Sequence, residues 1–512
     1  MSPRLATLLE TALVAAVLTV TPTTPAMAAD AEVSDGCVRS VPEPGSTAEV
    51  RICYTLFRPT GASADRPVPM LMHSHGWGGS RATDPGSVSA FLDAGYGVLS
   101  FDQRGFGESG GKAHVENPDF EGKDVRLLVD LISRLDWVRQ DGPGDPRLGA
   151  VGGSYGGGYQ FLGSFESLRV DGEPVFDALA PEITWHDLSE SLAPEGVVRT
   201  EWAAALSAAA IPSDALEPKI YKALVEGAAT GEWPDGSLPG GENMVKYFEK
   251  NGPKWHVRQG RRLGIPVLLG QGTTDTLFPL QQGLANWQKA LTPGARRRSI
   301  FVAFNGGHVL PALFPAGVDV TSDPCSEQLA DGNFRRLSVK FFDETLKHLD
   351  TGLNGWGKLH FATPASTCTT VDSFTANTEY AVGRVATTTT AGPPLTYQVA
   401  EGPVRVAGSP YLTGAVTALG LKNRAFYGLA VGTSPDDAKL VQNNVLPLNE
   451  PAPVIRAARR IALPSVAVDV PAGQQLYLVA TAFSDTFAGM GSRTPGVVVI
   501  DDTVVHLPVV GR

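Results

Sequence analysis

The chain has 512 residues, of which 43% are hydrophobic and 19% charged, and a formal net charge of −11 at pH 7. This length allows two or three domains, and the composition is typical of a globular protein with a sizeable core. The negative charge argues against nucleic acid or an anionic membrane surface as the main partner.

Residues 1–28 have the features of a secretory signal peptide. Arg4 gives a positive start, residues 12–20 are apolar, and Ala26-Met27-Ala28 matches a small-residue cleavage site. A short membrane anchor is the alternative, but the apolar run is too short to span a bilayer. We therefore expect an exported, soluble protein that has no membrane contact once the signal is removed.

The chain has four cysteines, Cys37, Cys53, Cys325 and Cys368, and this even number fits an oxidising compartment. Three pairings are possible, and proximity along the chain favours Cys37–Cys53 and Cys325–Cys368. Four buried free thiols are the alternative. No C-x-x-C motif occurs, which argues against zinc or redox use of these cysteines.

Hydrophobic patterns predict strands that alternate with helices up to about residue 349. We expect strands at 49–57, 69–73, 96–101, 148–151, 178–183, 265–270 and 299–304, and helices at 122–137, 157–166 and 334–349. This alternation is typical of a mostly parallel, doubly wound α/β sheet that is covered on both faces.

Two parts of the chain depart from that alternation. Residues 185–262 contain four tryptophans and an alanine-rich run, and we interpret them as a mainly helical lid over the carboxyl edge of the sheet. After about residue 369, short β-rich segments separated by Gly and Pro predict an antiparallel β-sandwich of the jelly-roll kind. The expected organisation is a signal peptide (1–28), an α/β core in two parts (29–184 and 263–368), a lid (185–262) and a β-sandwich (369–512).

Gly152-Gly153-Ser154-Tyr155-Gly156 has the pattern G-x-S-x-G between a predicted strand and a predicted helix. A sharp strand-to-helix turn strains the backbone of its central residue and exposes that side chain, and small flanking residues avoid collisions. Ser154 is therefore a candidate nucleophile on an α/β-hydrolase fold; a glycine-rich turn without chemistry is the alternative. Residues 107–111 have the same pattern without the strand and helix, so we interpret Ser109 as a loop serine.

A serine nucleophile needs a base, and the base needs an orienting acid. In α/β-hydrolases these follow the serine in the order Asp or Glu, then His. Asp275 lies in the loop after the strand expected at 265–270, and His308 follows the strand expected at 299–304 after two glycines. They are the candidate acid and base; a loop-capping aspartate and a histidine without a catalytic role are the alternatives.

The segment after the strand expected at 69–73 offers further candidates. His73 and His75 could ligate a metal, but no acidic residue follows at the next positions. Gly76-Trp77-Gly78-Gly79 is better interpreted as the loop that supplies a backbone N–H to an oxyanion hole, with Tyr155 supplying the second. Trp185, just beyond a strand end, is a candidate for substrate binding. This chemistry requires no metal or organic cofactor.

Two motifs of this chain resemble those of the cocaine esterase and X-Pro dipeptidyl-peptidase family. Residues 101–111 resemble its D-x-R-G-x-G-x-S-x-G loop, and residues 152–157 resemble its G-x-S-Y-x-G elbow. The order of hydrolase core, helical lid and C-terminal jelly roll is also similar. The resemblance implies a serine hydrolase that cleaves an acyl ester or an X-Pro peptide bond through a covalent acyl-enzyme.

The chain differs from the family pattern in two respects. Several members have a tyrosine in the oxyanion loop where this chain has Trp77, so we expect a hole built from backbone donors only. Larger members carry a helical N-terminal domain, which we expect to be missing here. An X-Pro peptidase also needs an acidic anchor for the substrate amine, and Glu182, Asp187 and Glu190 are candidates by location.

Three hypotheses therefore remain: an acyl ester hydrolase, a strict X-Pro dipeptidyl-peptidase, and a non-catalytic extracellular binding protein on a hydrolase scaffold. A small-molecule ester or peptide is the expected partner in the first two. The Ser, Asp and His candidates in the expected order argue against the third. No oligomeric state is predicted.

Overall fold

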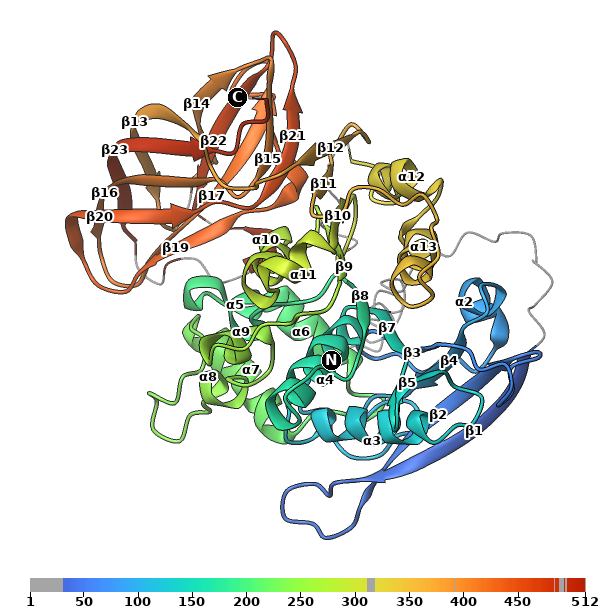
Figure 1. The fold of residues 1–512 in the computed structure, drawn as a ribbon. Helices are drawn as coiled ribbons and strands as arrows, with labels where there is room; N and C mark the ends of the chain where they lie inside the picture. The colour runs from blue at the N-terminus through green and yellow to red at the C-terminus, as the bar shows by residue number, and fades with distance from the viewer. Residues whose placement is uncertain are drawn as a thin grey trace, which may run out of the picture.

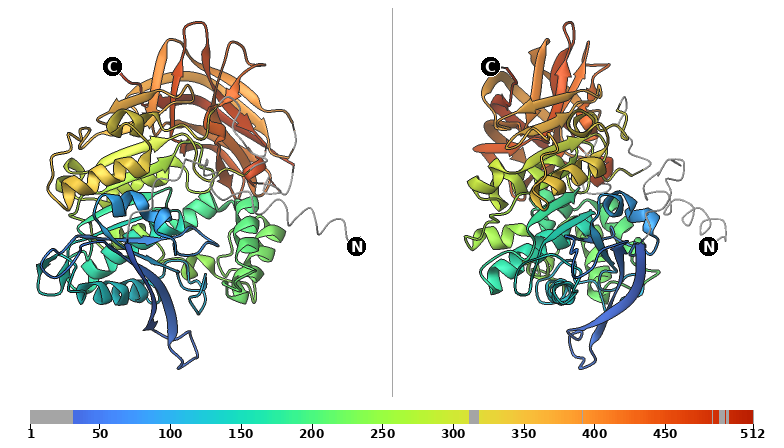
Figure 2. Two further views of the ribbon diagram at one scale, coloured as in Figure 1. Left: turned by 90° about the vertical axis from the view of Figure 1, so that its right-hand side faces the viewer. Right: turned by 45° about the vertical axis from the view of Figure 1, so that its right-hand side comes forward.

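The computed structural model describes residues 31–310, 318–390, 392–482, 484–487, 492 and 495–511. Within this part of the chain, a large mixed sheet flanked by helices forms one body and antiparallel sheets form another (Figure 1). The predicted signal peptide lies outside the described residues. In Figure 2 the C-terminal sheets lie at the opposite end of the molecule from the N-terminal strand pair β1 and β2.

The main sheet has 10 strands, and β3 and its neighbours from β4 to β11 run parallel to one another. In spatial order the strands are β1 (Ala31–Ser40), β2 (Val50–Pro59), β4 (Gly97–Phe101), β3 (Met70–Ser74), β7 (Leu148–Gly153), β8 (Ala178–Glu182), β9 (Leu268–Gly272), β10 (Ile300–Phe304), β11 (Leu359–Ala362) and β12 (Cys368–Val371). The edge strands β1, β2 and β12 pair antiparallel. The predicted doubly wound α/β sheet is confirmed.

Helices cover both faces of this sheet because successive strand residues point to opposite sides. In β3, Met70 and Met72 pack in the core that includes α3, α4 and α10, whereas Leu71 packs in the core that includes α2, α12 and α13. The helices are α2 (Ser89–Asp93), α3 (Glu121–Ser133), α4 (Tyr155–Val170), α10 (Leu280–Ala285), α11 (Pro293–Arg297), α12 (Pro324–Ala330) and α13 (Phe334–Thr345).

Between β8 and β9 the chain leaves the sheet and forms a group of short helices. They are α5 (Leu188–Leu192), α6 (Thr200–Ala209), α7 (Pro218–Thr230), α8 (Met244–Tyr247) and α9 (Pro253–Arg258), with a 3₁₀ turn η3 at Pro194–Gly196. Residues 185–262, called the lid segment below, are thus mainly helical. Because these helices follow the carboxyl end of β8, they lie beside the edge of the sheet where Ser154 is placed.

The C-terminal body is an antiparallel β-sandwich, as the sequence predicts. One sheet contains β13 (Thr378–Thr388), β23 (Val497–Leu507), β16 (Tyr411–Leu419) and β20 (Val454–Ala462). The other contains β14 (Leu395–Glu401), β22 (Gln475–Thr481), β17 (Asn423–Gly432), β18 (Lys439–Leu440) and β19 (Leu446–Glu450), and β15 (Val404–Gly408) pairs with β21 (Val466–Val470). One apolar cluster, to which both sheets contribute, forms the core of the sandwich.

The structure contains two disulfides, in the pairing that the sequence favours. Cys37 and Cys53 are register partners on β1 and β2. Cys325 joins α12 to Cys368 at the start of β12. Both bonds therefore fasten edge strands of the main sheet, where fewer backbone hydrogen bonds hold a strand in place.

Candidate active site

Ser154 occupies the turn between β7 and α4. Its backbone has φ 58° and ψ −119°, a conformation that is strained for any residue with a side chain. The turn is held by hydrogen bonds from Ser154 N to the Glu182 carbonyl (3.0 Å) and from Gly157 N to the Ser154 carbonyl (2.9 Å). The serine side chain is thereby fixed at the carboxyl end of the central strand.

The glycines of the turn are required by close backbone contacts. A Cβ atom at Gly156 would lie 2.4 Å from the Ser74 carbonyl oxygen, and one at Gly152 would lie 2.7 Å from the same atom. Neither separation is possible between real atoms. The G-x-S-x-G pattern therefore reflects how tightly the turn packs against the end of β3.

Ser154, His308 and Asp275 form a chain of hydrogen bonds. His308 Nε2 lies 2.8 Å from Ser154 Oγ, and His308 Nδ1 lies 2.7 Å from Asp275 Oδ2. Asp275 lies three positions beyond β9 and His308 four positions beyond β10. Neighbouring parallel strands end at the same edge of the sheet, so residues that are far apart in the sequence meet there.

The carboxyl group of Asp275 is held in place by the backbone of its own loop. The side chain is fully buried, and its Oδ1 accepts hydrogen bonds from the backbone N–H groups of Leu277 (2.9 Å) and Phe278 (2.7 Å). A carboxylate at Oδ2 orients the imidazole so that Nδ1 carries the proton. Nε2 is then left as an acceptor for the Ser154 hydroxyl.

Two glycines before His308 allow its loop to approach Asp275. Gly306 and Gly307 have φ values of +121° and +106°, which residues with a side chain rarely adopt. A Cβ at Gly307 would lie 2.6 Å from Asp275 Cβ. Glycine is therefore required before His308 because a side chain there would collide with Asp275.

The loop after β3 lies against Ser154. A Cβ built at Gly76 would lie 3.7 Å from Ser154 Cβ. Among the described residues, the backbone N–H groups of Trp77 and Tyr155 have no hydrogen-bond acceptor. The Trp77 side chain is held by its Nε1, which donates to the Leu206 carbonyl of α6 (2.9 Å), and by edge-on contact with the Tyr155 ring.

His73 and His75 serve the same loop from within the core. His75 donates from Nδ1 to the Gly76 carbonyl (2.8 Å), and its Nε2 accepts the Gln103 N–H (3.0 Å). His73 Nδ1 lies 2.9 Å from Ser100 Oγ. Burial lowers the pKa of both histidines, that of His73 to about 4. Neutral imidazoles with these partners act as structural supports for the loop after β3.

Three residues around the site have no signal in the sequence. Trp202 packs edge-on against the His308 ring and donates from Nε1 to Thr276 Oγ1 (3.0 Å). The Thr276 N–H in turn donates to the His308 carbonyl (3.1 Å). Asn444, from the β-sandwich, donates to the Asp275 carbonyl. Only the folded chain brings these residues together, so spacing along the sequence cannot find them.

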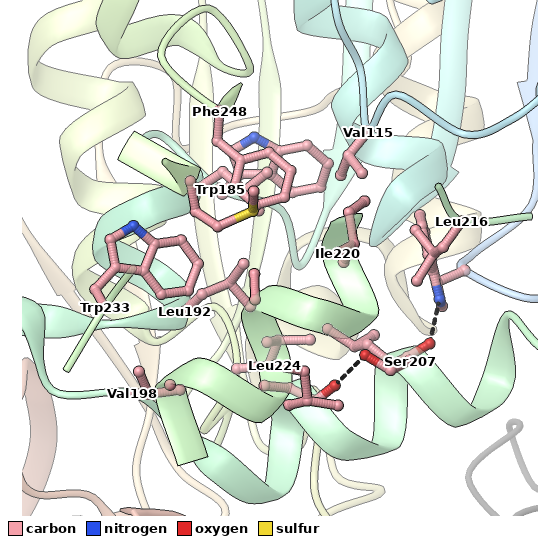
Figure 3. A pocket seen from close by; sticks show the side chains of 18 of the residues that line it. Val115, Trp185, Leu192, Val198, Ser207, Leu216, Ile220, Leu224, Trp233 and Phe248 are labelled. Atoms are coloured by element: carbon pink, nitrogen blue, oxygen red, sulfur yellow. Dashed lines mark hydrogen bonds between the residues drawn. The ribbon is translucent and has the colours of Figure 1, made fainter. Parts of the chain in front are cut away.

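A cavity opens beside Ser154 between the core and the lid segment (Figure 3). Trp185, the predicted substrate-binding residue, lines it, and its Nε1 donates to the Asn251 carbonyl (2.7 Å). The cavity is not lined by any of the three candidate amine anchors Glu182, Asp187 and Glu190. Asp187 instead caps α5 and forms an ion pair with Lys254.

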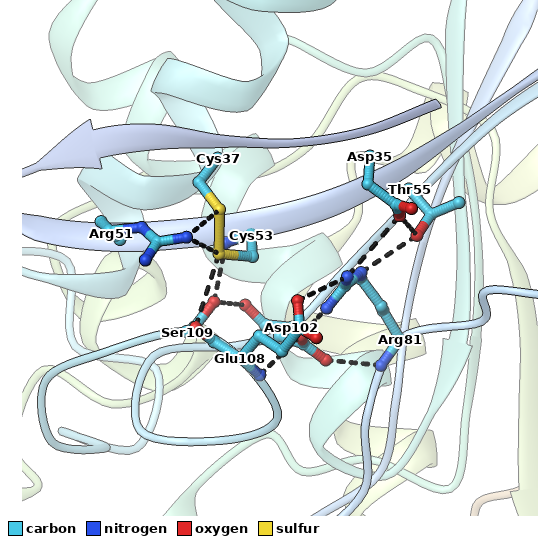
Figure 4. Close-up of a disulfide and its surroundings, with 9 residues drawn as sticks. All are labelled: Asp35, Cys37, Arg51, Cys53, Thr55, Arg81, Asp102, Glu108 and Ser109. Atoms are coloured by element: carbon cyan, nitrogen blue, oxygen red, sulfur yellow. Dashed lines mark hydrogen bonds and ion pairs between the residues drawn. A yellow bond between two sulfur atoms is a disulfide. The ribbon is translucent and has the colours of Figure 1, made fainter. Parts of the chain in front are cut away.

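The D-x-R-G-x-G-x-S-x-G loop is structural in this protein. Asp102 is buried, forms an ion pair with Arg81 and accepts the Glu108 N–H (2.9 Å), as Figure 4 shows. Ser109 Oγ accepts the Cys53 N–H and donates to the Asp102 carbonyl, both at 2.8 Å. This serine is a loop residue that ties the motif to the disulfide-bonded strand β2.

The family model described as X-Pro dipeptidyl-peptidase (S15 family) matches residues 48–309, a little over half of the chain. The chain belongs to this family. The match includes the hydrogen-bonded Ser154, Asp275 and His308, and the family to which the chain belongs is one of hydrolases.

Three solved structures share the fold over almost the whole length of this chain. An aminopeptidase from the marine sediment archaeon Thaumarchaeota archaeon has a TM-score of 0.66 at 13% identity, covering 97% of this chain and 99% of its own. A CocE/NonD family hydrolase from Staphylococcus aureus has a TM-score of 0.61 at 13% identity, covering 94% of each chain. An α-amino acid ester hydrolase has a TM-score of 0.60 at 13% identity, with coverage of 96% and 99%. At these identities the likeness concerns the fold.

Curated relatives match shorter segments. An uncharacterized 31.7 kDa protein of Escherichia coli is 34% identical over 104 residues, which are 20% of this chain and 34% of that protein. The chain thus spans about a third of the length of this relative. A non-heme chloroperoxidase of Streptomyces lividans is 25% identical over 225 residues, covering 41% of this chain and 76% of that protein.

Proposed function

We propose that Ser154 is the nucleophile, His308 the general base and Asp275 the orienting acid of an acyl hydrolase that works through a covalent acyl-enzyme. The observation that carries the proposal is the continuous hydrogen-bond chain of 2.8 Å and 2.7 Å that links the three side chains. The strained backbone of Ser154 supports it, because strain of this kind is typical of a functional turn.

The reaction follows from this geometry. Ser154 Oγ attacks the carbonyl carbon of the substrate while His308 Nε2 accepts the hydroxyl proton. His308 then gives this proton to the leaving group, and the acyl group remains on Ser154 Oγ. A water molecule, activated by the same nitrogen, attacks the acyl-enzyme and releases the acid. Asp275 keeps its charge throughout and stabilises the imidazolium.

Negative charge on the substrate oxygen is stabilised by the backbone N–H groups of Trp77 and Tyr155. Both belong to segments that adjoin Ser154, and both lack an acceptor among the described residues. Loss of one such donor typically lowers kcat by about 10²–10³-fold. The Trp77 ring, fixed between α6 and Tyr155, holds the loop in position.

The proposal includes export from the cell. It is supported by the features of residues 1–28 and by the two disulfides, which persist in oxidising compartments. Along the described residues, none of the helices has both the length and the hydropathy needed for a membrane span. Edman sequencing of protein recovered from the culture medium should begin at Ala29; an N-terminus at Met1 contradicts export by signal cleavage.

The experiment that tests the mechanism is trapping of the acyl-enzyme. With p-nitrophenyl acetate in excess, a burst of p-nitrophenolate should accompany a mass increase of one acetyl group on the peptide that contains Ser154. Ser154→Ala should show neither, and Ser109→Ala, in the second G-x-S-x-G pattern, should keep both. Acetylation elsewhere, or a burst that survives Ser154→Ala, contradicts the proposal. A folded protein without any burst or turnover favours the non-catalytic binding protein.

A further inference from the structure

The walls of the cavity beside Ser154 are apolar. It encloses about 880 Å³, including space open to solvent. Its lining residues are Trp77, Val115, Ser154, Tyr155, Trp185, Leu188, Leu192, Val198, Ala203, Leu206, Ser207, Leu216, Ile220, Ala223, Leu224, Gly227, Trp233, Pro234, Met244, Phe248, Leu277 and Phe278. Among these described residues none is Asp, Glu, Lys, Arg or His, and residues 311–317, which follow the site in the sequence, contain no such residue either.

Two helices of the lid segment leave room for this cavity through small side chains. On α7 the residues that line it recur at helical spacing and thus form one face: Ile220, Ala223, Leu224 and Gly227. On α6 they are Ala203, Leu206 and Ser207. Val225, on the same helix as Ala223, is 69% exposed and does not line the cavity. The small residues among them, Ala203, Ser207, Ala223 and Gly227, therefore leave the space open.

Polar groups in the walls are mostly bonded to protein. Ser207 Oγ donates to the Ala203 carbonyl (2.7 Å), and the indole nitrogens of Trp77 and Trp185 donate to backbone carbonyls. Trp233 Nε1 and Tyr155 Oη have no partner within the described part of the chain, and both groups are neutral. An occupant therefore finds apolar contact and neutral polar groups, but no counter-charge.

Glu116, which follows Val115 in the sequence, is an acid that does not line the cavity. Its side chain is buried, and neither carboxyl oxygen has a hydrogen-bond partner among the described residues. Burial raises the pKa of this carboxyl well above its usual value, and the charges of Glu121 and Asp124 raise it further. This carboxyl is therefore harder to ionise than an exposed one, and it does not line the cavity.

We propose that this cavity binds the acyl group of the substrate and selects uncharged apolar acyl chains, aliphatic or arylaliphatic, while it excludes acyl groups that carry a free α-ammonium. The inference rests on the proposed function of Ser154. An ammonium group without a partner would have to lose its water at high cost, whereas each methylene that leaves water is favourable. The protein is therefore an esterase of apolar acids within the S15 family, and not an X-Pro dipeptidyl-peptidase.

A matched pair of substrates tests this on the wild-type enzyme. The p-nitrophenyl esters of pentanoic acid and of 2-aminopentanoic acid differ only by the amine, which carries a proton at pH 6.5. After correction for spontaneous hydrolysis, we expect kcat/KM to be at least 100-fold higher for pentanoate. Along the series from acetate to octanoate, kcat/KM should rise at least tenfold. A preference for the amino ester, or for Ala-Pro-p-nitroanilide over pentanoate, overturns the inference.

Variants on α7 test whether this cavity causes the preference for longer acyl chains. Ala223→Leu adds volume on the cavity face and should lower the octanoate-to-acetate ratio of kcat/KM at least tenfold. Val225→Leu makes a similar change on the exposed face of the helix and should leave this ratio within threefold of wild type.

A variant of Glu116 tests whether this acid binds a substrate amine. Glu116→Gln should leave the pentanoate-to-amino-ester ratio of kcat/KM within threefold of wild type. A collapse of amino-ester turnover in this variant would identify Glu116 as an amine anchor and overturn the inference.

Labelling of the enzyme separates the two proposals. If a fluorophosphonate labels Ser154 and the substrate preferences are reversed, the cavity inference fails while the catalytic proposal stands. If Ser154 is not labelled in folded protein, the catalytic proposal fails and the inference fails with it.

Discussion

Asn444, in the C-terminal β-sandwich, donates a hydrogen bond from its side-chain Nδ2 to the backbone carbonyl of Asp275 at a distance of 3.1 Å. Both residues are buried, so water does not compete for this bond. Asp275 in turn holds the His308 imidazole at 2.7 Å. The sandwich therefore touches the candidate catalytic site directly and fixes the backbone of the loop that carries the acid.

Asn444→Ala should lower kcat about three- to tenfold with little change in KM, because a hydrogen bond of about 0.5–1.5 kcal/mol that positions the acid is lost. Steady-state kinetics with one p-nitrophenyl ester measure this. Asn449→Ala is the matched control, since Asn449 also donates from the sandwich, to the Glu195 carbonyl of the lid segment, at 3.0 Å. Equal losses in the two variants would mean that the sandwich only stabilises the fold.

Asp275→Asn should lower kcat about 10⁴-fold while the protein stays folded, because an amide does not hold the His308 tautomer that leaves Nε2 free to accept a proton. Kinetics together with circular dichroism check both parts. Asp187→Asn, which changes an acid of the lid segment that does not line the cavity, should keep kcat within threefold. Activity of Asp275→Asn within tenfold of wild type contradicts the assigned role.

The sequence predicts the central part of the fold and of the candidate site for a physical reason. Ser154, Asp275 and His308 each follow a buried, apolar parallel strand, and such strands are visible as apolar runs. Glycines next to Ser154 and His308 mark close backbone contacts, which are local properties of the chain. Local patterns of this kind are enough to place residues at the carboxyl edge of the sheet.

Other features are set by tertiary contacts and are not visible in the sequence. The edge strand β1 is mostly exposed and lacks a regular apolar alternation, so its pairing with β2 is not predicted. Asn444 reaches Asp275 only through docking of the sandwich, across 169 positions of the chain. The acidic residues proposed as amine anchors are candidates by their place at the end of β8 or after it, yet they do not line the cavity.

Gly156→Ala should destabilise the protein by at least about 2 kcal/mol, because the new Cβ would lie 2.4 Å from the backbone oxygen of Ser74 and the elbow would have to shift. Urea denaturation followed by tryptophan fluorescence measures the loss. Gly264→Ala is the control, since a Cβ there meets nothing within 4 Å. Wild-type stability of Gly156→Ala would mean that the turn is looser than described.

Glu116 should make the protein less stable as the pH rises above about 4.5. Above this usual pKa the unfolded chain releases the proton of this carboxyl, whereas burial in the folded protein retains it. Between pH 4.5 and 8, Glu116→Gln should therefore flatten the fall in unfolding free energy by at least about 1 kcal/mol. Chemical denaturation at several pH values measures the slope; identical slopes would show that Glu116 ionises normally in the folded state.

The most direct test of the proposed catalytic role is labelling with a fluorophosphonate, which reacts only with an activated serine. Peptide mapping of the labelled wild-type protein should place the adduct on Ser154, and His308→Ala should abolish labelling while the fold is kept. A folded wild-type protein that is not labelled, or an adduct on any other residue, would contradict the account.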